Sequence, residues 1–171
     1  MGKEKILKLE SSNINWILEM VSTCDSFTYA ENDTITTLNS YFTGGSFIVG
    51  KFVDTELAGY AILSLRPGED VNDLITKYNV ITDRKVWGNV GILNNCVISD
   101  NYRGRGYQLE LLKIREEAVS NLGLNEIFTS VHVRNTYSIN NLVKAGYKQI
   151  GQHYIQKEWL LFIKTFDKSE I

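Results

Sequence analysis

The apolar positions near the start of the chain repeat at helical spacing. Ile14, Ile17 and Val21 recur three or four residues apart, which predicts an amphipathic helix that begins near Asn13. The same spacing predicts a second, shorter helix over residues 34–42, and a pair of glycines marks its end. Two short helices are therefore expected before residue 46.

The period then changes to one typical of strands. Residues 46–53 and 57–65 are runs of β-branched and aromatic side chains separated by only three residues, and they predict an antiparallel hairpin. Pro67 ends the hairpin, and residues 71–78 fit one face of a short helix. Residues 90–98 are apolar almost throughout, which predicts a strand in the centre of a sheet.

The rest of the chain alternates helices and strands. A glycine-rich turn leads into a long helix with apolar residues at helical spacing up to Leu122. A strand, a helix and two final strands are predicted over residues 127–133, 137–145, 147–154 and 158–166. The order ααββ(α)βαβαββ predicts an α/β fold (α+β in some schemes), with helices on the faces of a mixed sheet.

Composition narrows the class of protein. A chain of 171 residues with 43% hydrophobic residues and one proline is expected to form a single domain, residues 1–171. The formal net charge of −2 gives no electrostatic argument for nucleic-acid binding. No apolar run approaches the length of a membrane span, no hydrophobic signal core is evident, and Cys24 and Cys96 lack metal-ligand spacing. A cytoplasmic protein without metal, nucleic-acid or membrane partners is expected.

The most informative segment is the turn between the central strand and the long helix. Two glycines, Gly104 and Gly106, stand between arginines and lead straight into the helix. Glycines permit a tight turn and close approach of a ligand, and the amides at a helix start favour phosphate. Taken alone, the segment is better explained as an ordinary glycine-rich turn with two solvated arginines, Arg103 and Arg105.

A second motif downstream makes the pattern more specific. The segment Arg103-Gly104-Arg105-Gly106-Tyr107-Gln108 resembles the Arg/Gln-x-x-Gly-x-Gly/Ala signature of the GNAT superfamily of acyl-CoA N-acyltransferases, with Gln108 in place of the small last residue. That superfamily also carries Asn-x-x-Ala/Ser-Ile and a closing Lys-x-Gly-Phe/Tyr. The chain has Asn135-Thr136-Tyr137-Ser138-Ile139 and Lys144-Ala145-Gly146-Tyr147. The resemblance extends over residues 47–166.

The resemblance implies a fold, a co-substrate and a set of contacts. The fold is a three-layer, mostly antiparallel sheet with helices on both faces, and the co-substrate is acetyl-CoA. Strand residues Cys96, Val97 and Ile98 are expected to pair with the pantetheine amides. The backbone amides of Arg103, Gly104, Arg105, Gly106, Tyr107 and Gln108 are expected to hold the pyrophosphate. Asn135 is expected to bond the pantetheine arm, with Ser138 packed nearby.

The acid and base of the reaction are less clear. Many relatives have a Tyr acid where this chain has Leu142, and a Glu base where it has Ile92. His132 is the best titratable candidate for the base, and its alternative is a structural histidine bonded to the backbone. A water-relayed proton path and a tyrosine from elsewhere, Tyr60 or Tyr137, stay open.

The expected activity is transfer of an acetyl group from acetyl-CoA to a primary amine of a small molecule or peptide by direct attack. The alternative is a catalytically weak CoA-binding sensor or interaction domain. Residues 25–29 lie where the superfamily lines its acceptor pocket, and Asp33 is among the acidic residues there that could attract a cationic amine. The Glu116-Glu117 pair is expected on a solvated helix face. Small enzymes of this kind often form homodimers, and the oligomeric state is left open.

Overall fold

The computed structural model describes residues 2–24, 33–80, 85–86, 88–155 and 157–166. Within them, seven strands form one sheet in the order β1-β2-β3-β4-β5-β7-β6. The strands are β1 (Glu4–Lys8), β2 (Phe47–Val53), β3 (Glu56–Pro67), β4 (Asn89–Ile98), β5 (Glu126–His132), β6 (Lys148–Ile155) and β7 (Lys157–Thr165). The helices are α1 (Ile14–Ser22), α2 (Ile35–Ser40), α3 (Gly68–Lys77), α4 (Tyr107–Asn121) and α5 (Thr136–Lys144), with short 3-10 turns η1 (Ser11–Asn13) and η2 (Asp100–Tyr102).

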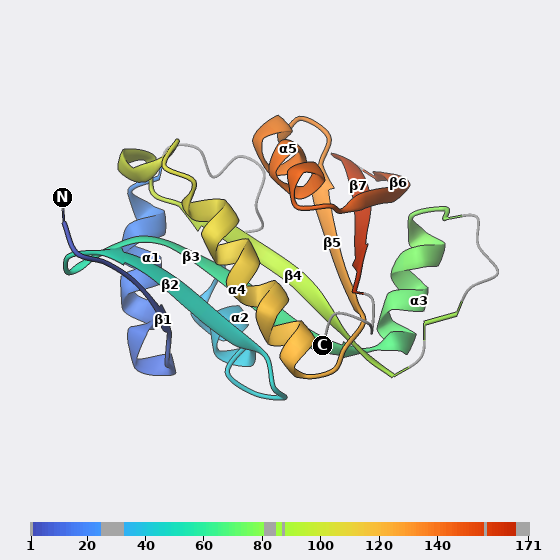
Figure 1. Ribbon diagram of the computed structural model, residues 1–171, viewed down its shortest axis with the longest axis horizontal. Coiled ribbons are helices and arrows are strands. Elements are labelled where there is room, and N and C mark those ends of the chain that lie inside the picture. The colour runs from blue at the N-terminus through green and yellow to red at the C-terminus, as the bar shows by residue number, and fades with distance from the viewer. Residues whose placement is uncertain (1, 25–32, 81–84, 87, 156, 167–171) are drawn as a thin grey trace. The chain divides into compact units, whose positions relative to one another are not determined.

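The sheet is mostly antiparallel. β2 pairs antiparallel with β1 and with β3, and β7 pairs antiparallel with β5 and with β6. β4 and β5 pair in parallel, with Gly91–Leu93 opposite Ile127–Thr129. This arrangement confirms the expected mixed sheet and the central place of β4 (Figure 1).

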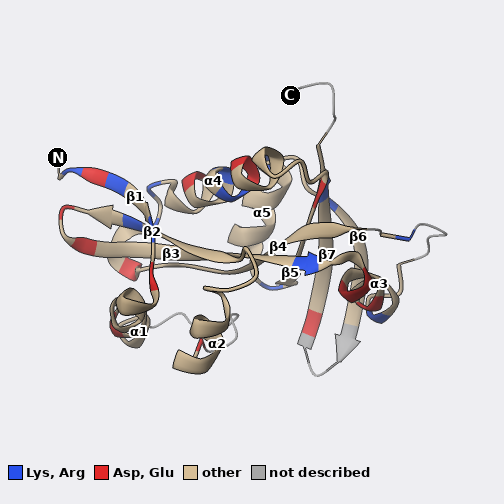
Figure 2. Cartoon of the chain, turned by 90° about the horizontal axis from the view of Figure 1, so that it is seen from below, with Lys and Arg blue, Asp and Glu red and all other residues tan. Residues whose placement is uncertain are grey.

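The chain divides into two compact units. The first comprises Met1–Ser64 and Asn94–Arg115, and the second comprises Leu65–Leu93 and Glu116–Ile171. In the first unit, α1 and α2 lie against one face of the β1–β3 strands and the start of α4 lies against the other (Figure 2). The first face buries Ile17, Leu38 and Tyr60, and the second buries Leu111.

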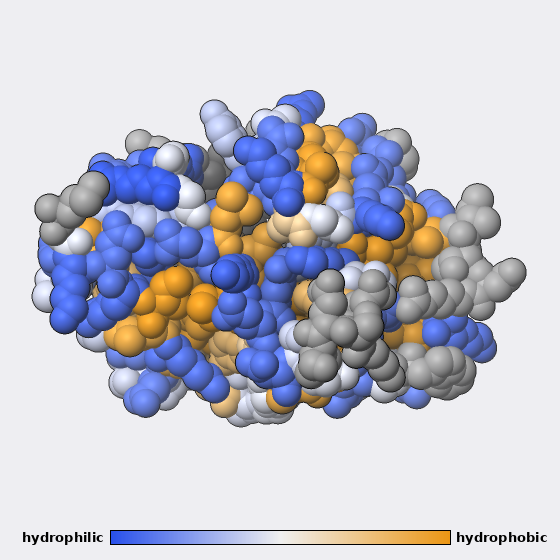
Figure 3. All heavy atoms as spheres, in the orientation of Figure 1, coloured by the Kyte–Doolittle hydropathy of each residue, from blue (hydrophilic) through white to orange (hydrophobic). Residues whose placement is uncertain are grey.

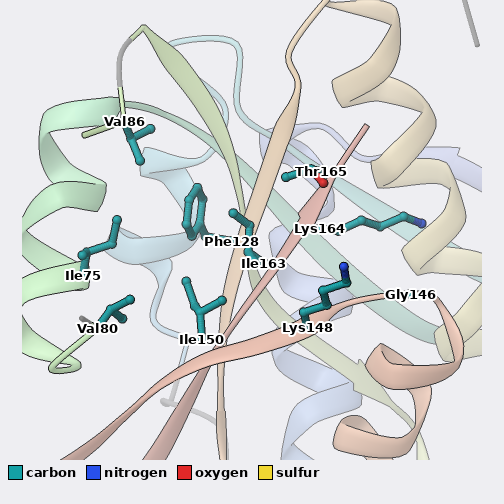
Figure 4. A pocket seen from close by; sticks show the side chains of 10 residues that line it. All are labelled: Ile75, Val80, Val86, Phe128, Gly146, Lys148, Ile150, Ile163, Lys164 and Thr165. Atoms are coloured by element: carbon teal, nitrogen blue, oxygen red, sulfur yellow. The ribbon is translucent and has the colours of Figure 1, made fainter. Parts of the chain in front are cut away.

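The second unit has a separate apolar cluster beneath α3. Val71 of α3 packs with Val90 and Phe128, and Ile150 and Ile163 lie against them. Beside this cluster is a cavity of about 410 Å³, and its wall includes Ile75, Val80, Val86, Lys148 and Lys164 (Figure 4). None of the site residues predicted from the sequence lines this cavity.

The elements predicted from the sequence are present, but one strand was missed. The N-terminal segment forms β1, whose register on β2 places Glu4 opposite Val53 and Lys8 opposite Val49. Most of β1 is solvent-exposed, so the segment lacks the continuous apolar run that revealed the other strands. The predicted order ααββ(α)βαβαββ is therefore corrected by a strand at its start.

The surface of the molecule mixes hydrophilic and apolar side chains. On the face drawn in Figure 3, apolar patches lie between hydrophilic residues, and α4 carries charges of both signs (Figure 2). None of the helices in the described part of the chain is both long and apolar enough to cross a membrane.

Candidate functional site

The glycine-rich turn follows β4 and η2 and runs into α4. Gly104 and Gly106 have φ angles of +75° and +83°, in the left-handed region that L side chains rarely adopt. A Cβ added to either residue would meet no atom within 4 Å. Both glycines are thus required by the backbone conformation, and the space beside them is open to a ligand at the amino end of a 15-residue helix.

The two arginines flank this turn at the surface. The backbone N–H of Arg103 donates to the Asp100 carbonyl at 3.4 Å, and its half-exposed guanidinium forms an ion pair with the Asp100 carboxylate at 3.0 Å. Arg105 donates to the Asn101 carbonyl at 3.4 Å and stacks over the Tyr102 ring. The Arg103 amide thus has a carbonyl acceptor within the turn, and the expectation that the amides of Arg103–Gln108 hold the pyrophosphate stays a prediction.

The first residue of α4 is fixed by a network around a buried lysine. The Tyr107 hydroxyl donates to Glu4 at 2.8 Å. Lys51, only 3% exposed, donates to Glu4 at 2.9 Å and to Glu110 at 2.6 Å, and its ammonium lies 4.5 Å from the centre of the Tyr107 ring. Burial lowers the pKa of Lys51, but its hydrogen bonds to Glu110 and Glu4 outweigh burial and raise it overall. These contacts tie β1 and β2 to the end of the helix that carries the turn.

This network predicts a specific loss of stability in acid. The hydrogen bonds from Lys51 and Tyr107 hold the pKa of Glu4 below its ordinary value of 4.5. A lowered folded-state pKa means that Glu4 stabilises the fold above pH 4.5 and that this contribution disappears as the pH falls through the folded-state pKa. In urea unfolding between pH 7 and pH 3, Glu4→Gln should reduce the acid-induced fall in the free energy of unfolding. A fall as steep as in the wild type would contradict this role, and Glu10→Gln is the control at an exposed position.

The strand residues before the turn alternate between the two faces of the sheet. Cys96 and Ile98 pack in the cluster with Leu111, whereas Val97 packs on the α1 side. Burial raises the pKa of the Cys96 thiol, so the thiolate needed for nucleophilic attack is disfavoured. We therefore expect the backbone of Cys96 to contact the pantetheine arm, as the resemblance implies, while its side chain packs in the cluster with Leu111.

The second motif begins α5 in the second unit. Asn135 is the N-cap, and its side-chain oxygen accepts the Ser138 amide at 3.2 Å. This capping bond gives Asn135 a structural role that needs no ligand, and it uses only the backbone of Ser138. The positions of Asn135 and Ser138 as pantetheine contacts stay predictions.

His132 ends β5 and is largely buried. Its Nδ1 accepts the backbone N–H of Arg134 at 3.1 Å, and its ring meets Trp159 edge-on at 5.7 Å. The lone pair on Nδ1 is thus engaged by the backbone, which is the arrangement of the structural alternative. The assignment of His132 as the base stays a prediction.

A substitution separates the two roles of His132. In His132→Asn the amide oxygen can still accept the Arg134 N–H, so we expect kcat to stay within about fivefold of wild type. A general base would instead be worth about 10²–10⁴-fold. Steady-state acetylation rates from pH 6 to pH 9 decide between them. A loss of that larger size, together with loss of the acidic limb of the profile, would establish catalysis by His132.

The other candidates for proton transfer have fixed places as well. Leu142 is buried, and Ile92 packs in the cluster beneath α3. Both side chains are aliphatic, so neither position offers an ionisable group. Tyr137 is 84% exposed. Tyr60 is fully buried and its hydroxyl donates to Asp33. Residues 25–29 lie outside the described residues.

The positions of two charged residues on α4 were not predicted from the sequence. The Glu116-Glu117 pair was expected on a solvated face. Glu117 is exposed, but the Glu116 side chain is 13% exposed and accepts from Lys164 at 2.8 Å, so the expectation was wrong for Glu116. Arg115 is buried and donates to the carbonyls of Leu111 and Ile62 at 3.0 and 3.1 Å. Charged residues inside the fold give no signal in a hydropathy pattern, because that pattern assigns charge to the surface.

Comparison with known proteins identifies the family to which the chain belongs. The sequence model of the acetyltransferase (GNAT) family matches residues 16–147. That match covers well over half of the chain. The chain belongs to the acetyltransferase (GNAT) family. Among curated protein sequences, none matches this GNAT protein.

Solved structures place the GNAT protein in the same fold. It superposes on an acetyltransferase of GNAT family from Streptococcus pneumoniae with a TM-score of 0.72 and 17% identity, covering 96% of this chain and 100% of that one. The ribosomal-protein-S18-alanine N-acetyltransferase from Escherichia coli gives 0.74 and 11%, covering 99% of both chains. Arabidopsis thaliana NAA60 in complex with acetyl-CoA gives 0.75 and 14%, covering 96% and 99%. At these identities the likeness establishes the fold.

Proposed function

We propose that this GNAT protein transfers an acetyl group from acetyl-CoA to a primary amine of a small molecule or peptide. The observation that carries the proposal is the left-handed turn at Gly104 and Gly106, with open space beside both glycines at the start of α4. The structural neighbours include an alanine N-acetyltransferase and a protein solved with acetyl-CoA, which supports the same co-substrate here.

The residues present suit the acetyl-CoA that the family implies. The amides of Arg103–Gln108 lie at a helix start, where backbone N–H groups and the positive end of the helix dipole favour a pyrophosphate. Arg103 and Arg105 add positive charge at the same turn. β4 offers the Cys96–Ile98 backbone to the pantetheine arm. The bound thioester supplies an activated acetyl group.

The protein's own contribution to catalysis is then mainly positioning. A neutral amine held about 3–3.5 Å from an activated carbonyl gains most of its rate from orientation. We expect a backbone N–H near Cys96 to stabilise the oxyanion that develops. Since Leu142 and Ile92 carry no ionisable group, the amine proton leaves through water or through another group, for which His132, Tyr60 and Tyr137 stay the candidates.

The same two residues favour the second candidate, a CoA-binding sensor with little turnover. Calorimetric titration with acetyl-CoA, followed by thiol release across a panel of alkylamines and peptide N-termini, separates the two. Binding in the micromolar range with amine-dependent thiol release supports the transferase. Binding without release from any amine supports the sensor, and no binding by the folded protein overturns both.

A further inference from the structure

The cavity beneath α3 is lined by residues of the second unit alone. Its volume of about 410 Å³ falls in the range of about 300–1,000 Å³ that is typical of small-molecule sites. The turn at Gly104 and Gly106 contributes nothing to its wall, and neither do the residues expected to contact pantetheine. A ligand in this cavity would therefore use none of the contacts expected for acetyl-CoA.

Hydrogen bonds hold α3 in place over the cavity. The Asn72 side chain donates to the Val86 carbonyl at 3.1 Å and accepts the Val86 amide at 2.9 Å. Just after the helix, the Tyr78 carbonyl accepts the Gln152 amide of β6 at 3.2 Å. A Cβ at Gly151 would lie only 2.8 Å from the Tyr78 carbonyl oxygen, so a glycine is needed for this close approach. The wall that α3 provides is thus tied both to the segment before β4 and to β6.

The floor and roof of the cavity are apolar. Phe128 is almost completely buried, whereas Ile75, Ile150 and Ile163 pack in the same cluster but are only partly buried. All four side chains line the cavity, and Figure 4 shows them around the same space. A ligand that covers the remaining surface of the three isoleucines would remove apolar area from water, which favours binding. The lining therefore selects an apolar group.

A basic side chain stands on the same face of the sheet as this lining. Lys148 on β6 is opposite Ile163 on β7 in the antiparallel register, so the two side chains leave the same face. Lys148 is exposed, which places it at the mouth of the cavity (Figure 4). Lys164 also lines the cavity, but its ammonium forms an ion pair with Glu116 at 2.8 Å. Of the two lysines, Lys148 is thus the one whose charge Glu116 does not balance.

An apolar cavity with one ammonium at its mouth suits a ligand with an apolar chain and a single negative charge. The described residues that line the cavity include no aspartate or glutamate that would repel an anion. A carboxylate carries one charge, whereas a phosphomonoester carries about −1.5 to −2 at pH 7, so the carboxylate matches a single lysine better. Each methylene group of the chain that leaves water should tighten binding by about fourfold.

We propose that the cavity beneath α3 binds the anion of a medium-chain fatty acid. Its alkyl chain would lie against Phe128 and the isoleucines, and its carboxylate would meet Lys148. This binding site is additional to the proposed acetyl-transfer site, and it does not depend on that activity.

The test is calorimetric titration of the full chain at pH 7 with octanoate, hexanoate and octanamide. Hexanoate lacks two methylene groups and should bind about 15-fold more weakly than octanoate. Octanamide has the same shape as octanoate but no charge, and it should bind about fivefold more weakly, the size expected of one partly exposed charge pair. No binding of octanoate, equal binding of octanoate and hexanoate, or equal binding of octanoate and octanamide overturns the proposal. These comparisons use the wild type, so no variant has to fold.

Two lysine substitutions locate the charge. Lys148→Gln should weaken octanoate binding by about fivefold and change octanamide binding by no more than about twofold. Lys144→Gln is the matched control, because Lys144 is an exposed lysine of the same unit and is not among the residues that line the cavity. It should leave octanoate binding unchanged. A loss in Lys144→Gln as large as that in Lys148→Gln would mean general attraction of anions and would overturn the proposal.

Repeating the octanoate titration with saturating acetyl-CoA separates the two sites. We expect the affinity for octanoate to stay the same, because the cavity uses none of the expected acetyl-CoA contacts. Displacement of octanoate by acetyl-CoA would place the fatty acid at the co-substrate site and would overturn the proposal. Failure of acetyl-CoA itself to bind would overturn the proposed function, whereas the octanoate series would still decide the role of the cavity.

Discussion

Replacing Gly106 by aspartate should weaken acetyl-CoA binding by on the order of 100-fold or more. The residue has φ +83°, and forcing an L side chain into the left-handed region costs about 1–2 kcal/mol. The new carboxylate would also stand at the helix start where the pyrophosphate is expected, and it would repel that anion. Calorimetric titration of acetyl-CoA into the purified variant measures the loss.

The chain provides a close control for this substitution at the other end of α4. Gly123 has φ +70° and, like Gly106, has no atom within 4 Å of an added Cβ. Gly123→Asp therefore introduces the same charge at a similar backbone cost, but at a helix C-terminus. It should bind acetyl-CoA within about threefold of the wild type. Equal losses in both variants would mean that the turn at Gly106 does not hold the phosphates.

Truncating Leu111 should cause the largest loss of stability among the single changes considered. Leu111 is completely buried on α4, where it packs with Val49 and Ala61. Removing a buried leucine side chain costs about 2–5 kcal/mol, because transfer energy is lost and a cavity remains. Leu111→Ala should lower the free energy of unfolding by about 3 kcal/mol in urea.

The same substitution at Leu122 calibrates that measurement. Leu122 lies just after α4 and is 54% exposed, so Leu122→Ala should change stability by no more than about 0.5 kcal/mol. A loss below about 1 kcal/mol for Leu111→Ala would show that α4 is not held through this contact. A comparable loss of stability in both variants would mean that burial of the Leu111 side chain is not the cause of the loss.

The parts of the fold that the sequence predicts are those with a periodic apolar pattern. The α1 helix, the β2–β3 hairpin and the central β4 strand each bury apolar residues at regular spacing, so their residue types reveal them. β1 escapes because it buries little of its own surface. Hydrophobic periodicity reports burial, and an exposed strand held by backbone pairing leaves almost no trace in it.

Among the polar contacts, too, some could be predicted from the sequence and others could not. The turn at Gly104 and Gly106 is formed by neighbouring residues, so a short sequence motif predicts it. The contacts of Asp33 with Tyr60 and Asn95 join three segments, and no single stretch of sequence indicates them. Lys51 shows the same limit, because its burial depends on carboxylates supplied by β1 and α4.

The N-terminal strand has a further consequence for how molecules of this protein meet. β1 is the last strand at one side of the sheet, so its outer backbone groups face away from β2. A sheet edge of this kind is a template for a strand from another molecule. Lys5 and Lys8 place two lysines within the five residues of that edge, and lysines on an edge strand are one of the features by which proteins oppose edge-to-edge pairing. The strand that fastens Lys51 and Tyr107 thus also discourages edge-to-edge aggregation at high protein concentration.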